Sequence, residues 1–185
     1  MRVLALADKR PIVDPATLVR QRGVDAVLTL GDLDRAWIES LMSLDVPRLG
    51  VHGNHDPEGL LQDLEIEDLH LRRTQVGGVT IGGFEGCVRY GKNTVYQYTQ
   101  REASKLVRRL PAADVLICHC PPLGINDDPE DPSHIGFEGL REWLDEHRPR
   151  HLLHGHVHPL HGQVMTRHGD TRVHWISGTR VLDLS

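Results

Sequence analysis

The chain has few aromatic residues, no long apolar run and no excess of positive charge. Phe, Trp and Tyr make up 4% of its 185 residues, and the net charge is −5. The basic clusters at 101–109 and 148–150 contain few aromatic side chains, which favours solvated helix faces over a nucleic-acid surface. No apolar run approaches the ~20 residues of a membrane helix. The first ten residues lack a signal-peptide cleavage site, so we expect a cytoplasmic protein that does not enter a membrane.

Cysteine is equally scarce. Cys87, Cys118 and Cys120 are an odd number of cysteines, which indicates reduced thiols rather than a disulfide framework. The segment Cys118-His119-Cys120 invites a zinc interpretation, but no second cysteine pair accompanies it. We therefore disfavour a zinc site built from thiolates.

Histidine, by contrast, is abundant. The chain has thirteen histidines, and five of them lie between His151 and His161. Imidazole is a common ligand of transition metals, so this clustering indicates a metal site. Any single histidine is more often a structural residue, so the pattern as a whole carries the prediction.

Apolar runs alternate with helical patterns in the first half of the chain, and β-rich segments follow. Asp14 as N-cap, Pro15 at the first helical position and Gly23 as the stop mark one helix, and Thr99 caps another. No repeat or linker interrupts the pattern, which indicates one domain over 1–185 with two sheets packed face to face and helices outside. Strands are expected within 2–7, 24–32, 46–56, 69–86, 113–122 and 149–158, helices within 14–23, 33–44, 57–65, 98–111 and 137–148, and a terminal hairpin within 162–179.

Five of the predicted strands end in side chains that bind metals. Because ligand sites in α/β proteins form at the carboxyl ends of strands, these side chains converge if the strands are neighbours. Glycines before three of them allow the backbone to approach the centre closely. The strand-end residues are Asp8; Asp32 after Gly31; Asn54, His55 and Asp56 after Gly53; His119; and His156 and His158 after Gly155.

The ligand types are carboxylate oxygen, amide oxygen and imidazole nitrogen, a mixture that suits Mn, Fe, Zn or Mg-like divalent ions. Two such ions ~3.5–4 Å apart can hold a phosphoryl group and activate a water. Asp32 can bridge both ions because a carboxylate has two oxygens. One or two divalent ions are therefore the expected cofactor.

The order of these motifs resembles that of the calcineurin-like metallophosphoesterase family, and within it the small Icc-type phosphohydrolase branch. The family pattern is D-x-H, GD, GNH followed by D or E, H, and GHxH. The resemblance extends from residue 2 to about residue 178. It implies an α/β fold, a four-layer α-β-β-α sandwich of two packed mixed sheets. It also implies a first metal held by Asp8, Asp32 and His158, and a second held by Asp32, Asn54, His119 and His156.

The same resemblance implies catalytic roles for the residues after Asn54. His55, steadied by Asp56, would protonate the leaving oxygen or stabilise the pentavalent state. His134, within the Pro- and Asp-rich loop 121–136, would reach a substrate phosphate. The loop itself is expected to shape the substrate pocket, because long loops inside compact domains are commonly functional.

Arg10 departs from the family pattern, which has a metal-binding histidine at this position. A guanidinium has no acceptor and cannot ligate a metal. Three interpretations compete, and we expect the first, with Arg10 as a catalytic and substrate-binding residue. Arg10 binds the substrate phosphate and assists catalysis; or it turns to solvent while Asp8, Asp32, His158 and waters hold the first metal; or the site has lost activity. Lys9 is expected to point into solvent.

Two further histidines flank the last motif. His154 lies two residues before His156 and shares its strand face if the segment is extended. It could support a ligand or supply the missing imidazole, but a hydrogen-bonded structural role is favoured. His161 has no assigned role.

The sequence thus predicts a metal-dependent phosphoesterase that hydrolyses a small phosphodiester or phosphomonoester through a metal-activated water. Its expected partner is a small phosphorylated substrate rather than nucleic acid or a membrane. A binding scaffold with a weakened site on the same fold is the main alternative, and a nuclease is the third.

Overall fold

The computed structural model describes residues 1–92, 95–158 and 164–185, which form two large sheets and a two-stranded one. The first large sheet has the order β13-β1-β2-β3-β4. Strands β1 to β4 are parallel, and β13 is antiparallel to β1. Their bounds are Arg2–Ala7 (β1), Ala26–Thr29 (β2), Arg48–Gly50 (β3), Glu67–Asp68 (β4) and Gly178–Asp183 (β13).

The second large sheet has the order β11-β12-β10-β9-β6-β5, and its central strands β6, β9, β10 and β12 are parallel. Its strands are Arg73–Val76 (β5), Val79–Phe84 (β6), Val115–Cys118 (β9), His151–His154 (β10), Arg167–His168 (β11) and Thr171–Trp175 (β12). The small sheet pairs β7 (Cys87–Val88) with β8 (Gln97–Tyr98).

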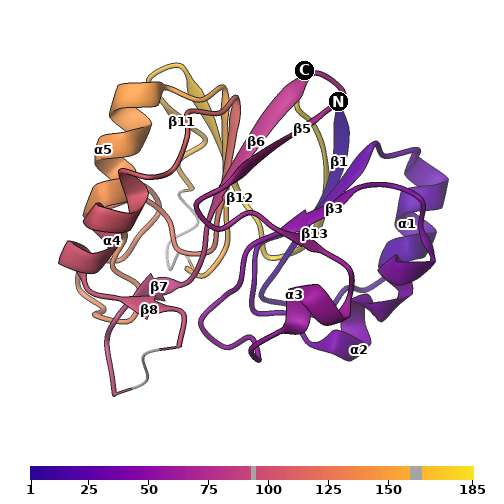
Figure 1. Ribbon diagram of the computed structural model, residues 1–185, viewed down its shortest axis with the longest axis horizontal. Coiled ribbons are helices and arrows are strands. Elements are labelled where there is room, and N and C mark those ends of the chain that lie inside the picture. Colours follow the sequence, from indigo (N-terminus) through magenta and orange to yellow (C-terminus); the bar gives the residue numbers. More distant parts are fainter. Residues whose placement is uncertain (93–94, 159–163) are drawn as a thin grey trace.

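Helices cover the outer faces of both large sheets, which makes the four-layer sandwich that the sequence predicts (Figure 1). On one side lie α1 (Pro15–Arg22), α2 (Arg35–Ile38), the 3-10 helix η1 (Glu39–Ser43) and α3 (Leu60–Asp63), and on the other lie α4 (Gln100–Val107) and α5 (Glu138–His147). No helix in the described part of the chain is long and apolar enough to cross a membrane.

The predicted caps are present. Asp14 accepts a hydrogen bond from the Thr17 backbone N–H, and Gly23 ends α1 in the left-handed conformation at φ 56°. Thr99 and Glu102 form a reciprocal capping box at the start of α4. These local signals determine where α1 begins and ends and where α4 begins.

The apolar core has three parts that match the layers. Val3, Leu28 and Leu153 belong to the cluster between the two sheets. A second cluster lies between the second sheet and the α4/α5 layer, and a third lies between the first sheet and α1, η1 and α3. Strands β1, β2 and β9 are buried along nearly their whole length, as expected for parallel strands covered on both faces.

Two expectations from the sequence need correction. The helix expected over 33–44 is a four-residue α-helix that continues as η1. The terminal hairpin is short, because β11 and β12 pair only at Arg167–Arg172 and His168–Thr171. The chain then leaves this sheet and forms β13 on the edge of the first one. The sequence pattern missed this crossing because it depends on an edge that only the assembled sheet offers.

Candidate metal centre

Three of the predicted ligands follow their strands in strained backbone conformations. Asp8, Asp32 and His156 have φ of 61°, 55° and 67°, in the left-handed region that non-glycine residues rarely adopt. The neighbouring glycines are required by space, as the sequence predicts. A Cβ on Gly53 would overlap Asp32 Oδ1, and one on Gly155 would lie 2.9 Å from Asp8 Oδ2.

His119 sits at the centre of the rim and is fully buried. Its Nδ1–H donates to the Leu30 carbonyl oxygen at 2.7 Å, which leaves Nε2 facing the site. Nε2 lies 3.1 Å from Asn54 Oδ1 and 3.4 Å from Asp32 Oδ2. The bond to Leu30 also joins the two sheets at their carboxyl ends.

His156 is oriented in the same manner. Its Nε2–H donates to the Ser133 carbonyl oxygen at 2.8 Å, so Nδ1 retains its lone pair. Its backbone N–H lies 3.1 Å from both oxygens of Asp8. One ligand atom from each of Asp32, His119 and His156 lies within 4.8 Å of the other two.

Asp32 and Asn54 are held so that one oxygen of each remains directed at His119. Asp32 Oδ1 accepts from the His55 backbone N–H at 2.8 Å, which leaves Oδ2 next to His119. The Asn54 amide nitrogen donates to the Tyr90 hydroxyl at 3.3 Å, which turns Oδ1 toward His119.

A cation fits this donor set. Carboxylate, amide and imidazole atoms converge on one place, and each of the two imidazoles is fixed by a carbonyl acceptor at one ring nitrogen, which leaves the other nitrogen for the cation. Asp32, Asn54, His119 and His156 are the residues that would hold it. Asp8 and His158 line the same cavity of about 290 Å³ and are available for a second ion beside Asp32.

Two carboxylates and two imidazoles lie close together in this site, and burial and their mutual charges shift their pKa values. Burial raises the pKa of Asp8 to about 6, and the nearby Asp32 adds to the rise. Burial also acts on Asp32, but the adjacent His119 outweighs it and lowers the Asp32 pKa to about 2. His119 in turn has its pKa raised to about 9, because the attraction of Asp32 exceeds the cost of burial. Burial lowers the pKa of His156 to about 3, so its imidazole is neutral.

These shifts predict that metal affinity depends on pH. Below about pH 6 Asp8 holds a proton that a metal must displace, and at neutral pH His119 must also release one. We expect Mn affinity to fall by about tenfold per pH unit for each proton displaced as the pH decreases from about 7.5 to about 5. Titration calorimetry in buffers of different ionisation enthalpy measures both the affinity and the protons released. An affinity that stays constant over this range would contradict the assignment of these ligands.

His55 and Asp56 are neighbours in the chain, but the first is exposed and the second is buried. His55 is exposed and lines both the metal-centre cavity and an adjoining hollow of about 460 Å³. Asp56 is buried, and its two oxygens accept the backbone N–H groups of Gly53 and Leu33 at 2.7 and 2.8 Å. Asp56 therefore orders the backbone of both ligand loops, which corrects the expectation that it steadies the His55 ring.

The structure does not bring Arg10 into the site. Its side chain is exposed and lines neither the metal-centre cavity nor the adjoining hollow. Pro11 follows it, and a residue before proline is biased toward an extended backbone. This geometry favours the interpretation in which Arg10 turns to solvent. Lys9 is also exposed, as expected.

We accordingly expect Arg10→Ala to change kcat/KM by no more than about threefold, the range of a neutral surface substitution. Arg10→Lys serves as the matched variant. A phosphate clamp would show the opposite pattern, with a large loss in Arg10→Ala that Lys does not restore, because a point charge does not reproduce a bidentate fork. Steady-state kinetics on the three proteins separates the two outcomes.

His134 does lie in the cavity, as predicted. Its Nδ1–H donates to Asp131 Oδ2 at 2.7 Å, and its ring centre is 5.2 Å from that of His156. Tyr90 and Ser133 also line the cavity, and the sequence analysis missed both. Tyr90 carries no motif, and Ser133 contributes a backbone carbonyl, which no sequence pattern reveals.

The remaining metal-binding candidates have structural roles. His154 is fully buried, with Nε2 accepting from Asn126 at 2.9 Å and Nδ1–H donating to the Gly155 carbonyl, so it does not replace the missing imidazole. Burial raises the pKa of Cys118 and Cys120 far above the usual range, which leaves protonated thiols. His161 lies outside the described residues.

A second group of polar side chains surrounds His52, two residues before Asn54. Glu85 accepts from the His52 ring at 3.2 Å and from the Tyr98 hydroxyl, and its backbone N–H donates to His70. Tyr96 stacks on His52 with ring centres 4.4 Å apart. His52 directly precedes Gly53, so this network fixes the start of the ligand loop.

Residues 7–160 match the sequence model of a protein family described as calcineurin-like phosphoesterase. The chain belongs to the calcineurin-like phosphoesterase family. The matched range contains every strand-end residue of the metal centre described above. No curated protein sequence matches this chain at a significant level.

Solved structures share the fold of this phosphoesterase-family chain at low sequence identity. The crystal structure of TT1561 of Thermus thermophilus has a TM-score of 0.67 and 14% identity, and covers 100% of this chain and 99% of its own. A hypothetical protein from the same organism has a TM-score of 0.54 and 21% identity, with 96% of this chain and 76% of its own covered. These likenesses concern the fold alone.

Proposed function

We propose that this protein is an active metal-dependent phosphoesterase acting on a small phosphorylated substrate. The observation that carries the proposal is the donor set of Asp32, Asn54, His119 and His156, with both imidazoles oriented by carbonyl acceptors. A bound divalent ion would supply the positive charge that polarises a phosphoryl group and lowers the pKa of water. Manganese, iron and zinc all suit these ligands.

The protein's own residues divide the remaining tasks. His55 is exposed in both hollows, where its imidazole reaches a leaving oxygen and donates a proton to it. His134 is fixed by Asp131 through Nδ1, and in its doubly protonated form its Nε2–H donates a hydrogen bond to a phosphate oxygen in the cavity. Asp56 holds the loops that carry Asp32 and Asn54 in register.

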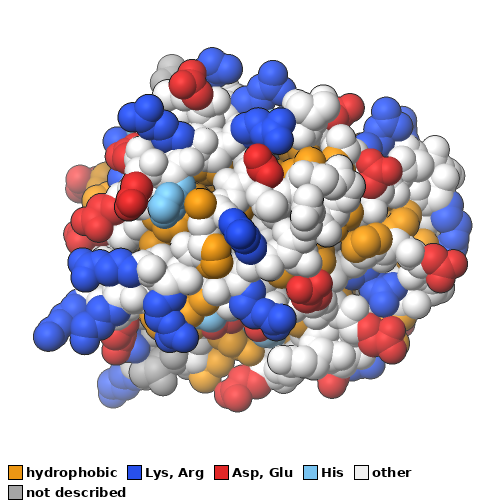
Figure 2. Space-filling model, turned by 45° about the horizontal axis from the view of Figure 1, so that its top comes forward, with side chains coloured by type: hydrophobic (Ala, Val, Ile, Leu, Met, Phe, Trp, Pro, Cys, Tyr) orange, Lys and Arg blue, Asp and Glu red, His pale blue; other side chains and the backbone are white. Residues whose placement is uncertain are grey.

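The size and charge of the site favour a small substrate. The metal-centre cavity has about 290 Å³, at the lower end of the range of small-molecule sites, and the adjoining hollow of about 460 Å³ shares Asp8, Asp32 and His55 with it. The second hollow gives room for one further substituent, as in a small diester. On the face shown in Figure 2, which is the side of the two termini and not that of the metal centre, Lys and Arg side chains are scattered among Asp and Glu rather than aligned in a stripe. A cytoplasmic location is consistent with the three free thiols.

The test is an assay of the purified protein with Mn, Fe or Zn against bis-p-nitrophenyl phosphate and p-nitrophenyl phosphate. We expect metal-dependent turnover of at least one of them, with the relative rates deciding between diesters and monoesters. A protein that binds metal but hydrolyses neither ester would favour the scaffold alternative. Submicromolar affinity for DNA or RNA at physiological salt would instead favour the nuclease alternative.

A further inference from the structure

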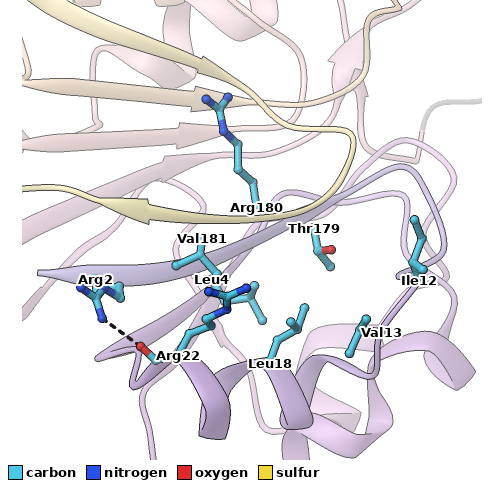
Figure 3. A pocket seen from close by; sticks show the side chains of 9 residues that line it. All are labelled: Arg2, Leu4, Ile12, Val13, Leu18, Arg22, Thr179, Arg180 and Val181. Carbon is cyan, nitrogen blue, oxygen red and sulfur yellow. Dashed lines mark hydrogen bonds between the residues drawn. The ribbon is translucent and has the colours of Figure 1, made fainter.

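A groove on the outer face of the first sheet is separate from the metal centre. It has a volume of about 610 Å³ and lies between α1, the edge strand β13 and the segment before α1 (Figure 3). Its lining shares no residue with the metal-centre cavity or the hollow beside it. This volume is in the range of small-molecule sites in proteins.

One end of the groove is cationic. The Arg2 guanidinium donates to the Arg22 carbonyl oxygen at 3.0 Å, and the Arg22 side chain extends over the same end (Figure 3). Among the described residues, neither guanidinium forms an ion pair with a carboxylate. Two acids lie near Arg2: Asp25 accepts the Arg2 backbone N–H, and Asp183 pairs with the N-terminal ammonium at 3.8 Å while the charge of Arg2 also helps to lower its pKa. Two guanidinium groups without a carboxylate ion pair among the described residues are suited to a carboxylate, phosphate or sulfonate.

The rest of the groove is apolar. Leu18 is half-buried in its lining, Leu4 contributes no exposed surface, and Ile12, Val13 and Val181 line it as well. These last three are among only seven large hydrophobic side chains that are exposed in the described part of the chain. Arg180 turns away from the groove, and its guanidinium donates to the Trp175 carbonyl of the other sheet. Such clustering of exposed apolar side chains marks a binding surface rather than ordinary surface.

We propose that this groove binds a small amphiphilic anion, with its charged head at Arg2 and Arg22 and its apolar body on Val13, Leu18 and Val181. The charge distribution favours such a ligand over a second copy of the chain. A two-fold contact through this groove would bring a second pair of arginines to the same face, and like charges repel. The chain as a whole carries a net charge of −5, so the cationic end is a local exception.

The experiment is titration calorimetry of the full chain with octane-1-sulfonate, a probe that phosphoesterases cannot hydrolyse, below its micelle concentration. We expect saturable binding at one site, and binding of sulfate and of 1-octanol that is weaker by about tenfold or more, because each probe lacks one half of the ligand. Arg22→Ala and Val181→Ser should each weaken octane-1-sulfonate binding by about tenfold. Arg101→Ala, on exposed α4 at the opposite side of the molecule, should leave it unchanged.

Three results would overturn the proposal. The first is an absence of binding at about 1 mM probe. The second is binding that both groove variants retain, which would place the probe elsewhere, including at the metal centre. The third is a dimer, seen by sedimentation velocity, that Val181→Ser converts to a monomer, because the groove would then be an interface between copies. None of these outcomes bears on the phosphoesterase assay, so the two proposals stand or fall separately.

Discussion

Replacing His156 with alanine is expected to abolish metal binding at the central site and phosphoesterase activity with it. The imidazole Nδ1 is a member of the ligand group, and its orientation is fixed by the Ser133 carbonyl. We expect metal affinity to fall by more than about 100-fold, beyond the losses typical of changes in residues that only support a ligand. Metal analysis after gel filtration and steady-state kinetics measure the two effects.

Two controls separate ligand loss from misfolding. His156 has φ 67°, which alanine tolerates poorly, so His156→Gly is the companion variant because glycine adopts this conformation freely and brings no ligand atom. His168→Ala removes an imidazole of the edge strand β11 that pairs with Asp145 of α5, and should leave metal content unchanged. A His156→Ala protein that is folded and retains one metal per chain would contradict the site assignment.

Replacing His55 with alanine is expected to leave the metal in place and lower kcat by about 10²–10⁴-fold, the usual contribution of general acid–base catalysis. The side chain lines both hollows without belonging to the ligand group. Its loss therefore removes a proton donor and leaves the metal ligands unchanged. The His55 backbone N–H, which orients Asp32, remains in the variant. Metal content, kcat and KM should be measured on the same preparation.

The matched control for His55 is His147→Ala, which removes a histidine from the end of α5, outside both hollows. We expect it to retain wild-type kcat. If His55→Ala also retains wild-type kcat with its metal bound, the residue has no part in proton transfer. If it loses the metal instead, its role is to hold Asp32.

The positions of the ligands could be predicted from the sequence because they depend on local signals. Gly31, Gly53 and Gly155 mark sharp turns at the ends of buried strands, and parallel strands place their carboxyl ends at one rim. The caps Asp14 and Thr99 act through residues three positions away, so their helices were predictable too. The resemblance to a family then implied the four-layer arrangement.

Tertiary structure alone decided which side chains reach the site from outside these motifs. The direction of Arg10, the carbonyl of Ser133 against His156 and the hydroxyl of Tyr90 against Asn54 all depend on packing between segments far apart in the chain. The groove of Arg2, Arg22 and Val181 likewise exists only because β13 crosses to the edge of the first sheet. The end of a strand depends on the residues of that segment. The hydrogen-bond partner of a side chain depends on distant segments that only folding brings next to it.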